Sequence, residues 1–194
     1  MPYDPHKHHR RSIRLKGYDY TTSGIYFVTI CVQNRHCVLG EVINGEMVLS
    51  PIGQIVADAW CWLAEQYDYV MLGAWTVMPN HLHGLLMLVD LPALDSGTGT
   101  SRRGASRRAP TTDVSVKVKS LGQLVGAFKT VSTKAINKLQ ETPGTRFWQR
   151  NYYERIVRNE REQRAIEQYI YNNPATWPED KLHPDAPPNR FNQG

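Results

Sequence analysis

Two histidines separated by one leucine, His81 and His83, are the residues in this chain best suited to chemistry. They begin an apolar run, residues 81–89, that is typical of a buried β-strand. Because a strand points residues i and i+2 to the same face, the two imidazoles stand side by side, about 6 to 7 Å apart at the backbone. One metal ion could bind both. A histidine in a strand more often serves packing, however, and two protein ligands are too few for a catalytic metal site.

The missing ligand is expected on a helix predicted for residues 160–172. Tyr169 and Asn173 are four residues apart and therefore share one helical face. Asn173 can offer a carbonyl oxygen to Mg²⁺ or Mn²⁺, and mixed imidazole and oxygen ligation suits Mn²⁺ in particular. Tyr169 would then present its phenolic oxygen beside the metal, where cationic surroundings activate a phenol as a nucleophile.

Other tyrosines compete for this role. They are Tyr152, Tyr153 and Tyr171. Tyr171 is offset from Tyr169 by about 200° around the helix, so the two cannot face the same metal.

The hydrophobic pattern predicts the elements that position these residues. Strands are expected at 24–32, 37–43, 46–49, 70–77 and 81–89, helices at 51–66, 121–139 and 160–172, and an extended segment at 147–157. Asn44-Gly45 is a strong hairpin signal, and Ser50-Pro51 is typical of a helix start. This order predicts an α+β fold with a ferredoxin-like antiparallel sheet and helices packed on one face.

The chain is expected to divide into three parts. Residues 1–20 form a basic N-terminal arm, residues 21–175 form the catalytic domain, and residues 176–194 form an irregular C-terminal tail. Within the domain, residues 93–116 are rich in Ser, Thr, Gly, Pro and Arg, which predicts a flexible loop.

Positive charge is unevenly distributed over the 194 residues, whose formal net charge is +5. It gathers in residues 6–16 and 102–119, and two such runs favour a polyanionic partner, above all nucleic acid. For such a partner, the candidates for phosphate contacts are Arg10, Arg11, Arg14 and Lys16, and Gln149 and Arg150 would line a basic face. Tyr18, Tyr20 and Trp148 are candidates for stacking on unpaired bases, and for Trp148 core packing beside Phe147 is the favoured interpretation.

The composition also limits the cellular setting. No apolar run approaches the roughly 18 to 20 residues of a membrane span, and the N-terminus lacks a secretory signal. The three cysteines lack Cys-x-x-Cys spacing, so neither a zinc site nor a disulfide framework is expected. These features predict a protein of the reducing cytoplasm, without a membrane partner and associated with the nucleoid when bound to DNA.

Several stretches together resemble one family. They are residues 78–84, 147–158 and 169–174, with residues 10–20 and 26–31 fitting the same pattern. The combination is similar to the REP-associated tyrosine transposases, within the IS200-like, single-tyrosine HUH transposases. The matching pieces cover residues 8–90 and 118–175.

The resemblance implies a ferredoxin-like fold, a divalent metal (Mg²⁺ or Mn²⁺), and a transposase that nicks and rejoins single-stranded DNA hairpins of repeated extragenic palindromes. It implies a covalent 5′-phosphotyrosine intermediate and a free 3′-OH. By this resemblance His81 and His83 match the histidine motif, Tyr169 the nucleophile and Asn173 the polar third ligand. The insertion at 94–116 and the tail depart from the family pattern, which bears on substrate choice more than on chemistry.

Two alternatives stay open from the residues alone. One is a non-catalytic protein that binds hairpin DNA or RNA on the same fold. The other is a metal-dependent phosphodiesterase in which water attacks and the tyrosine is incidental. Either a monomer or a homodimer is compatible with the sequence.

Overall fold

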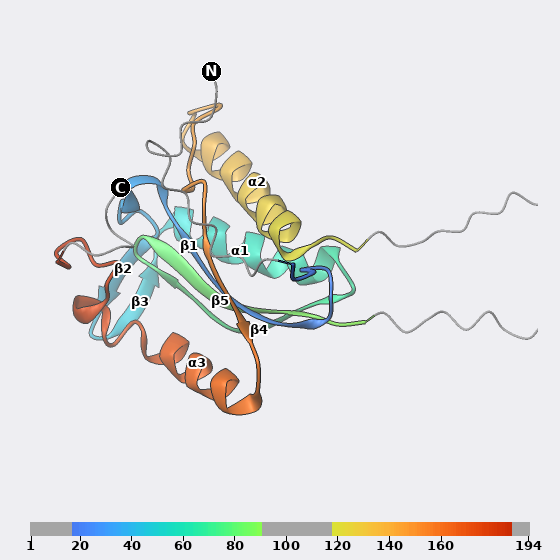
Figure 1. The fold of residues 1–194 in the computed structure, drawn as a ribbon. Coiled ribbons are helices and arrows are strands. Elements are labelled where there is room, and N and C mark those ends of the chain that lie inside the picture. The colour runs from blue at the N-terminus through green and yellow to red at the C-terminus, as the bar shows by residue number, and fades with distance from the viewer. Residues whose placement is uncertain (1–16, 91–117, 188–194) are drawn as a thin grey trace, which may run out of the picture.

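A computed structural model describes residues 17–90 and 118–187 (Figure 1). Its centre is an antiparallel sheet with strand order β4-β5-β1-β6. These strands are β1 (Gly24–Cys31), β4 (Val70–Met78), β5 (His81–Leu88) and β6 (Tyr153–Val157). The helices are α1 (Pro51–Gln66), α2 (Leu121–Leu139) and α3 (Glu160–Asn172), with short 3-10 turns η1 (Gln33–Arg35) and η2 (Trp177–Glu179).

The connections interleave two split β-α-β units. β1 leads through α1 to β4 and leaves room for β5 between them, and β5 leads through α2 to β6 with β1 between them. This is the ferredoxin-like arrangement, so the predicted α+β class and antiparallel sheet are confirmed. In the described part of the chain, no helix has both the length and the apolar character needed to cross a bilayer.

The helices cover both faces of the sheet, which corrects the expectation that all would pack on one face. Tyr26 and Val28 of β1 are buried together with α1 and α2. On the opposite face, Ile170 of α3 packs with Phe27 and Leu85 (Figure 1). The physical reason lies in the central strands, which are apolar at odd and even positions alike and therefore need cover on both sides.

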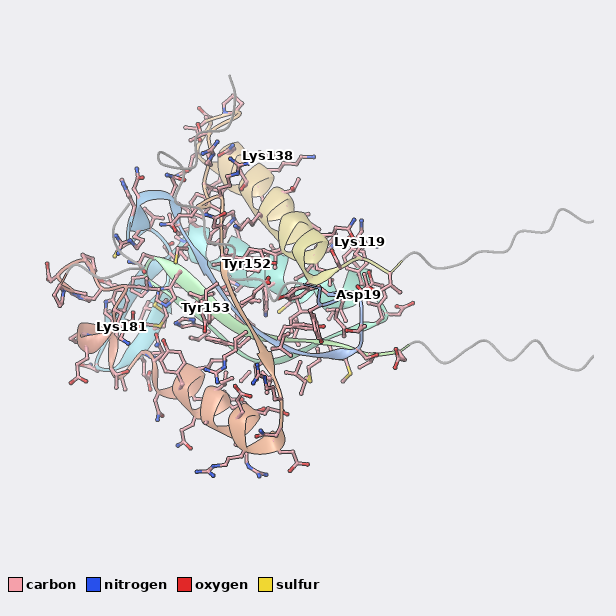
Figure 2. The ribbon with its side chains drawn as sticks, in the orientation of Figure 1. Asp19, Lys119, Lys138, Tyr152, Tyr153 and Lys181 are labelled. Atoms are coloured by element: carbon pink, nitrogen blue, oxygen red, sulfur yellow. The ribbon has the colours of Figure 1, made fainter. Side chains whose placement is uncertain are left out.

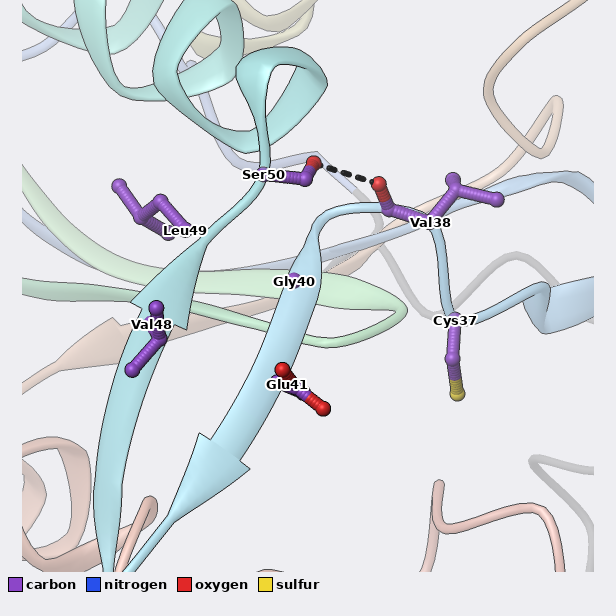
Figure 3. A pocket seen from close by; sticks show the side chains of 7 residues that line it. All are labelled: Cys37, Val38, Gly40, Glu41, Val48, Leu49 and Ser50. Atoms are coloured by element: carbon purple, nitrogen blue, oxygen red, sulfur yellow. Dashed lines mark hydrogen bonds between the residues drawn. The ribbon is translucent and has the colours of Figure 1, made fainter.

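A separate hairpin, β2 (Gly40–Ile43) and β3 (Glu46–Leu49), is inserted before α1. Its predicted Asn44-Gly45 turn is present, with positive φ at both residues (52° and 81°), as a type I′ turn requires. Figure 3 shows how the hairpin joins α1: the Ser50 hydroxyl donates to the Val38 carbonyl at 2.7 Å. Ser50 also accepts from the Gly53 amide, so it is the predicted N-cap. A hollow beside Ser50 has a volume of about 320 Å³. The residues that line it are Cys37, Val38, Gly40, Glu41, Val48, Leu49 and Ser50 (Figure 3).

Gly84 explains how the histidine strand fits against α1. A Cβ atom at Gly84 would lie 2.6 Å from Cζ2 of Trp60, which is fully buried. Trp60 in turn packs edge-on against Phe128 of α2, with ring centroids 5.4 Å apart. The face of β5 that does not carry the histidines is thus filled by a tryptophan that leaves room only for glycine.

We expect Gly84→Ala to lower the free energy of unfolding by about 1–3 kcal/mol, because the new methyl group overpacks the Trp60 ring. Urea denaturation at fixed pH measures this change. Gly126→Ala is the matched control, since a Cβ at Gly126 meets no atom within 4 Å. In a helix this control should be stabilising by about 0.5–1 kcal/mol. An unchanged midpoint for Gly84→Ala would show that Trp60 does not restrict this position.

Candidate active site

His81 and His83 lie on the face of β5 that α3 covers, and both are buried. Their Nε2 atoms are 2.9 Å apart. Because β5 is a central strand paired on both sides, its backbone holds this geometry rigidly. Two nitrogen lone pairs at this separation are well placed to share one cation.

Asn80 determines which nitrogen of His81 carries the proton. The Asn80 amide donates to the backbone carbonyls of Leu182 (2.8 Å) and Arg35 (3.2 Å), and these bonds fix its orientation. Its Oδ1 therefore faces Nδ1 of His81 at 2.7 Å and accepts that N–H. The lone pair of His81 is left on Nε2, toward His83, as in metal-binding histidines held by a second hydrogen bond.

His83 is held in a similar way from the neighbouring strand. Its Nδ1 lies 2.8 Å from the Thr29 hydroxyl of β1, and these two residues are direct cross-strand partners. The ring also stacks on Phe27, with centroids 5.5 Å apart. Neither Asn80 nor Thr29 was predicted as a site residue, because a single buried amide or hydroxyl has no periodic signal.

Burial keeps both imidazoles neutral. It lowers the pKa of His81 to about 3. The pKa of His83 is also lowered, chiefly by burial and then by repulsion from His81, with a partial offset from Asp180. Neutral imidazole is the form that binds metal, so the pair does not need to lose protons at neutral pH before a cation can bind.

Helix α3 brings Tyr169 to the histidines. The side chain of Asn159 caps the start of this helix. Tyr169 Oη lies 3.1 Å from Nε2 of His83, and the residue as a whole is 46% exposed, so part of it reaches the surface. The three competitors are placed otherwise: Tyr171 is 70% exposed, Tyr152 packs on the α1–α2 side of the sheet, and Tyr153 packs beside Phe27.

The Tyr169 phenol is protonated at neutral pH. Its pKa is raised to about 12, first by burial and then by the charge of Asp180, against a lowering hydrogen bond from Asn173. A divalent cation beside the oxygen would oppose both raising effects, because it favours the phenolate.

Asn173 lies four residues after Tyr169, where it is the C-cap of α3, and it is buried. Its Nδ2 donates to Oδ2 of Asp180 at 3.1 Å. Its Oδ1 is buried and has no hydrogen-bond partner among the described residues. A buried acceptor without a donor is costly, and ligation of a cation would satisfy it.

Asp180 is a site residue that the sequence analysis missed, since it lies in the expected irregular tail. Its carboxylate and the imidazoles of His81 and His83 offer ligand atoms that all lie within 4.8 Å of one another. The tail reaches the site because Trp177 and Leu182 are buried, at 8% and 9% exposure. These two apolar residues in a polar segment were the available signal.

Together, these donors fit a divalent cation. Two imidazole nitrogens, a carboxylate oxygen and an amide oxygen form the mixed nitrogen and oxygen set that Mn²⁺ accepts. The cluster of His81, His83 and Asp180 could therefore bind a metal, and the unsatisfied Asn173 oxygen is a further ligand candidate.

The structure describes two of the six expected DNA-binding residues. Arg10, Arg11, Arg14 and Lys16 lie outside the described residues. Gln149 is half-buried and Arg150 is exposed, in the segment that leads into β6. Of the stacking candidates, Trp148 is buried and donates from Nε1 to the Ser132 hydroxyl at 2.9 Å, so its core-packing interpretation is confirmed. Tyr18 and Tyr20 pack edge to face on each other, with ring centroids 5.0 Å apart.

Comparison with known proteins gives a family. No protein-family model matches the chain. An uncharacterized protein of Haemophilus influenzae is 36% identical over 190 residues, which cover 94% of this chain and 98% of that protein. The chain belongs to the same family as this protein.

A solved structure has the same fold. It is a REP-associated tyrosine transposase bound to a REP hairpin, with a TM-score of 0.55 and 20% sequence identity. The match covers 89% of this chain and 77% of that chain. At this identity the likeness establishes the shared fold.

We expect Asn80→Ala to weaken Mn²⁺ binding by about 10–100-fold, because His81 loses the acceptor that orients its ring. Isothermal titration of the purified protein with Mn²⁺ measures the affinity. Asn137→Ala is the matched control, since the Asn137 amide also donates to a backbone carbonyl, that of Thr145 at 2.9 Å, but on α2. Equal affinities for the two folded variants would remove Asn80 from the site.

Asp180→Ala should weaken Mn²⁺ binding by roughly tenfold or more if its carboxylate binds the cation, because the site then loses its one anionic ligand. The control is Asp185→Ala, whose side chain is 92% exposed. Undiminished affinity in the Asp180 variant would limit that residue to the hydrogen bonds that it accepts from the Asn173 side chain and the Leu182 amide.

Proposed function

We propose that the protein is a metal-dependent DNA transposase or endonuclease that nicks and rejoins single-stranded, REP-like hairpin DNA through Tyr169. One observation carries the proposal: the Tyr169 hydroxyl lies 3.1 Å from Nε2 of His83, beside a cluster of side chains that could bind a metal ion. A half-exposed tyrosine in this position would be within reach of a phosphodiester and close to the cation that would activate it.

In the proposed reaction, Tyr169 Oη attacks the scissile phosphorus and the bond to the 3′ oxygen breaks. The phenol loses its proton and the departing 3′ oxygen gains one, so the products are a 5′-phosphotyrosine ester and a free 3′-OH. One phosphodiester replaces another, and attack by a 3′-OH on the phosphotyrosine can rejoin the strand. His81, His83, Asp180 and Asn173 would hold a divalent cation, Mg²⁺ or Mn²⁺, which supplies Lewis-acid polarisation of a phosphate oxygen when bound.

The substrate proposal rests on fold and charge. The solved structure of the same fold holds a REP hairpin. In our proposal Arg10, Arg11, Arg14 and Lys16 contact phosphates, and Gln149 and Arg150 line the DNA path near the site. A phosphodiester in an unpaired strand can reach a buried metal more easily than one held in a duplex, which favours cutting at the foot of a hairpin.

The division of the chain follows from the same proposal, with one addition. Residues 1–20 act as a DNA-binding arm and 21–175 as the catalytic domain, while residues 177–183 of the tail complete the metal site. Because Tyr169 contacts His83 of its own chain, the proposal has the tyrosine act at the metal site of the same subunit.

The decisive test uses a 3′-labelled single-stranded hairpin oligonucleotide with Mn²⁺ or Mg²⁺, followed by a denaturing protein gel. We expect a labelled band at the mass of the protein, because the 5′ end of the labelled fragment stays on the enzyme. Tyr169→Phe should reduce this band on the order of 10³-fold or more while hairpin binding persists. Tyr171→Phe, a change two residues along the same helix on an exposed phenol, should leave it intact.

The other outcomes identify the alternatives. Cleavage without a labelled protein band would indicate attack by water and a metal-dependent phosphodiesterase. Hairpin binding without cleavage in either metal would indicate a non-catalytic binding protein on the same fold.

A further inference from the structure

The strand pairing beside the site is interrupted by a bulge. β1 and β6 are in register at Thr29 and Tyr153, and beyond β6 the next paired residues are Val32 and Trp148. Between these pairs one strand has residues 30–31 and the other has residues 149–152. The second strand thus carries two extra residues, so its backbone must leave the regular ladder.

Lys129 of α2 binds the backbone of this bulge. Its Nζ donates to three consecutive carbonyls, those of Gln149 (2.8 Å), Arg150 (3.4 Å) and Asn151 (3.1 Å). The ammonium also lies 5.5 Å from the ring centre of Tyr152. An ammonium group has three N–H donors, so one partly buried side chain supplies donors to three carbonyls that have left the regular ladder.

The partial burial of Lys129 supports a structural purpose for its charge. Burial lowers the pKa of Lys129 to about 8, against a smaller raising effect from Cys31, so the amine remains charged at neutral pH. Desolvating a cation is costly unless it gains strong partners, and here those partners are the three carbonyls.

The bulge lies close to the proposed active site. The amide of Gln149 donates to the carbonyl of Cys31 at 3.0 Å, and Cys31 is the cross-strand partner of His81. Gln149 is therefore two strand spacings, about 10 Å, from His81 at the backbone. If the scissile phosphate of a DNA strand reaches Tyr169, the neighbouring nucleotides would be close enough to contact this segment.

We propose that Lys129 is a positioning residue for DNA binding: it holds residues 149–151 so that Gln149 and Arg150 meet the strand next to the scissile phosphate. This inference rests on the proposed function and assigns the bulge as the surface that contacts the nucleotides beside the cut. Lys129 itself contacts backbone carbonyls and does not need to touch DNA.

The test measures hairpin affinity in a Tyr169→Phe background with Mn²⁺, by fluorescence anisotropy at fixed salt. Lys129→Met should weaken binding by about tenfold, and Lys129→Arg should restore most of it, because the guanidinium also donates several N–H groups. Lys138→Met, near the C-terminal end of the same helix (Figure 2), is the control and should change affinity less than about twofold. In a Gln149→Ala/Arg150→Ala background, Lys129→Met should have almost no further effect, since coupled residues are not additive.

Two further measurements separate positioning from general damage. Mn²⁺ affinity should be unchanged in Lys129→Met, and hydrogen exchange should quicken at residues 149–152 while the histidine strand stays protected. If Lys129→Met does not fold, Lys129→Gln is measured in the same way.

The outcomes distinguish this inference from the function on which it rests. Wild-type affinity for the hairpin in the Lys129 variants, or an equal loss with and without Gln149 and Arg150, would overturn the positioning role alone. Absence of hairpin binding by the wild-type protein would overturn both proposals.

Discussion

The site depends on the requirement that β5 be buried on both of its faces. Residues of a strand alternate between the two faces of the sheet. The even-numbered residues of β5 therefore lie in one buried layer and the odd-numbered residues in the other. On one side Gly84 accommodates the Trp60 indole between the sheet and α1, and on the other His81 and His83 meet α3. A shift of one residue would place the histidines against Trp60 and an apolar helix layer. The close fit between Gly84 and Trp60 therefore supports the register that presents the histidines to Tyr169.

Burial on that second face sets the chemistry of the histidines. Desolvation favours neutral imidazoles, and the hydrogen bond to Asn80 leaves the lone pair of His81 on the nitrogen that faces His83. The same environment disfavours the phenolate of Tyr169, and the carboxylate of Asp180 disfavours it further. A cation bound between these groups would compensate the carboxylate, satisfy the Asn173 oxygen and favour the phenolate. One bound cation would therefore offset each of these unfavourable features of the site.

Distant parts of the chain converge on Asn80. Its amide binds the carbonyl of Arg35, which follows β1, and that of Leu182, which lies in the tail. Leu182 in turn donates its amide to Asp180, so the position of the carboxylate depends on the same short turn. The orientation of His81 and the placement of Asp180 are therefore linked through one buried side chain, and the tail is part of the site's architecture.

Local pattern was sufficient to predict much of this protein. The alternation of His81 and His83 in an apolar strand, the spacing of Tyr169 and Asn173, the Asn44-Gly45 turn and the order of the elements all depend on neighbours within a few residues, and the α+β class follows from them. The tertiary structure decided what no local period encodes. It placed α3 on the face opposite α1 and α2, brought Asp180 across from the tail, and supplied Asn80, Thr29 and Lys129 as partners of groups far away in sequence. The physical reason is that the hydrogen bonds and burial of these side chains are satisfied only after the sheet has formed and both of its faces are covered.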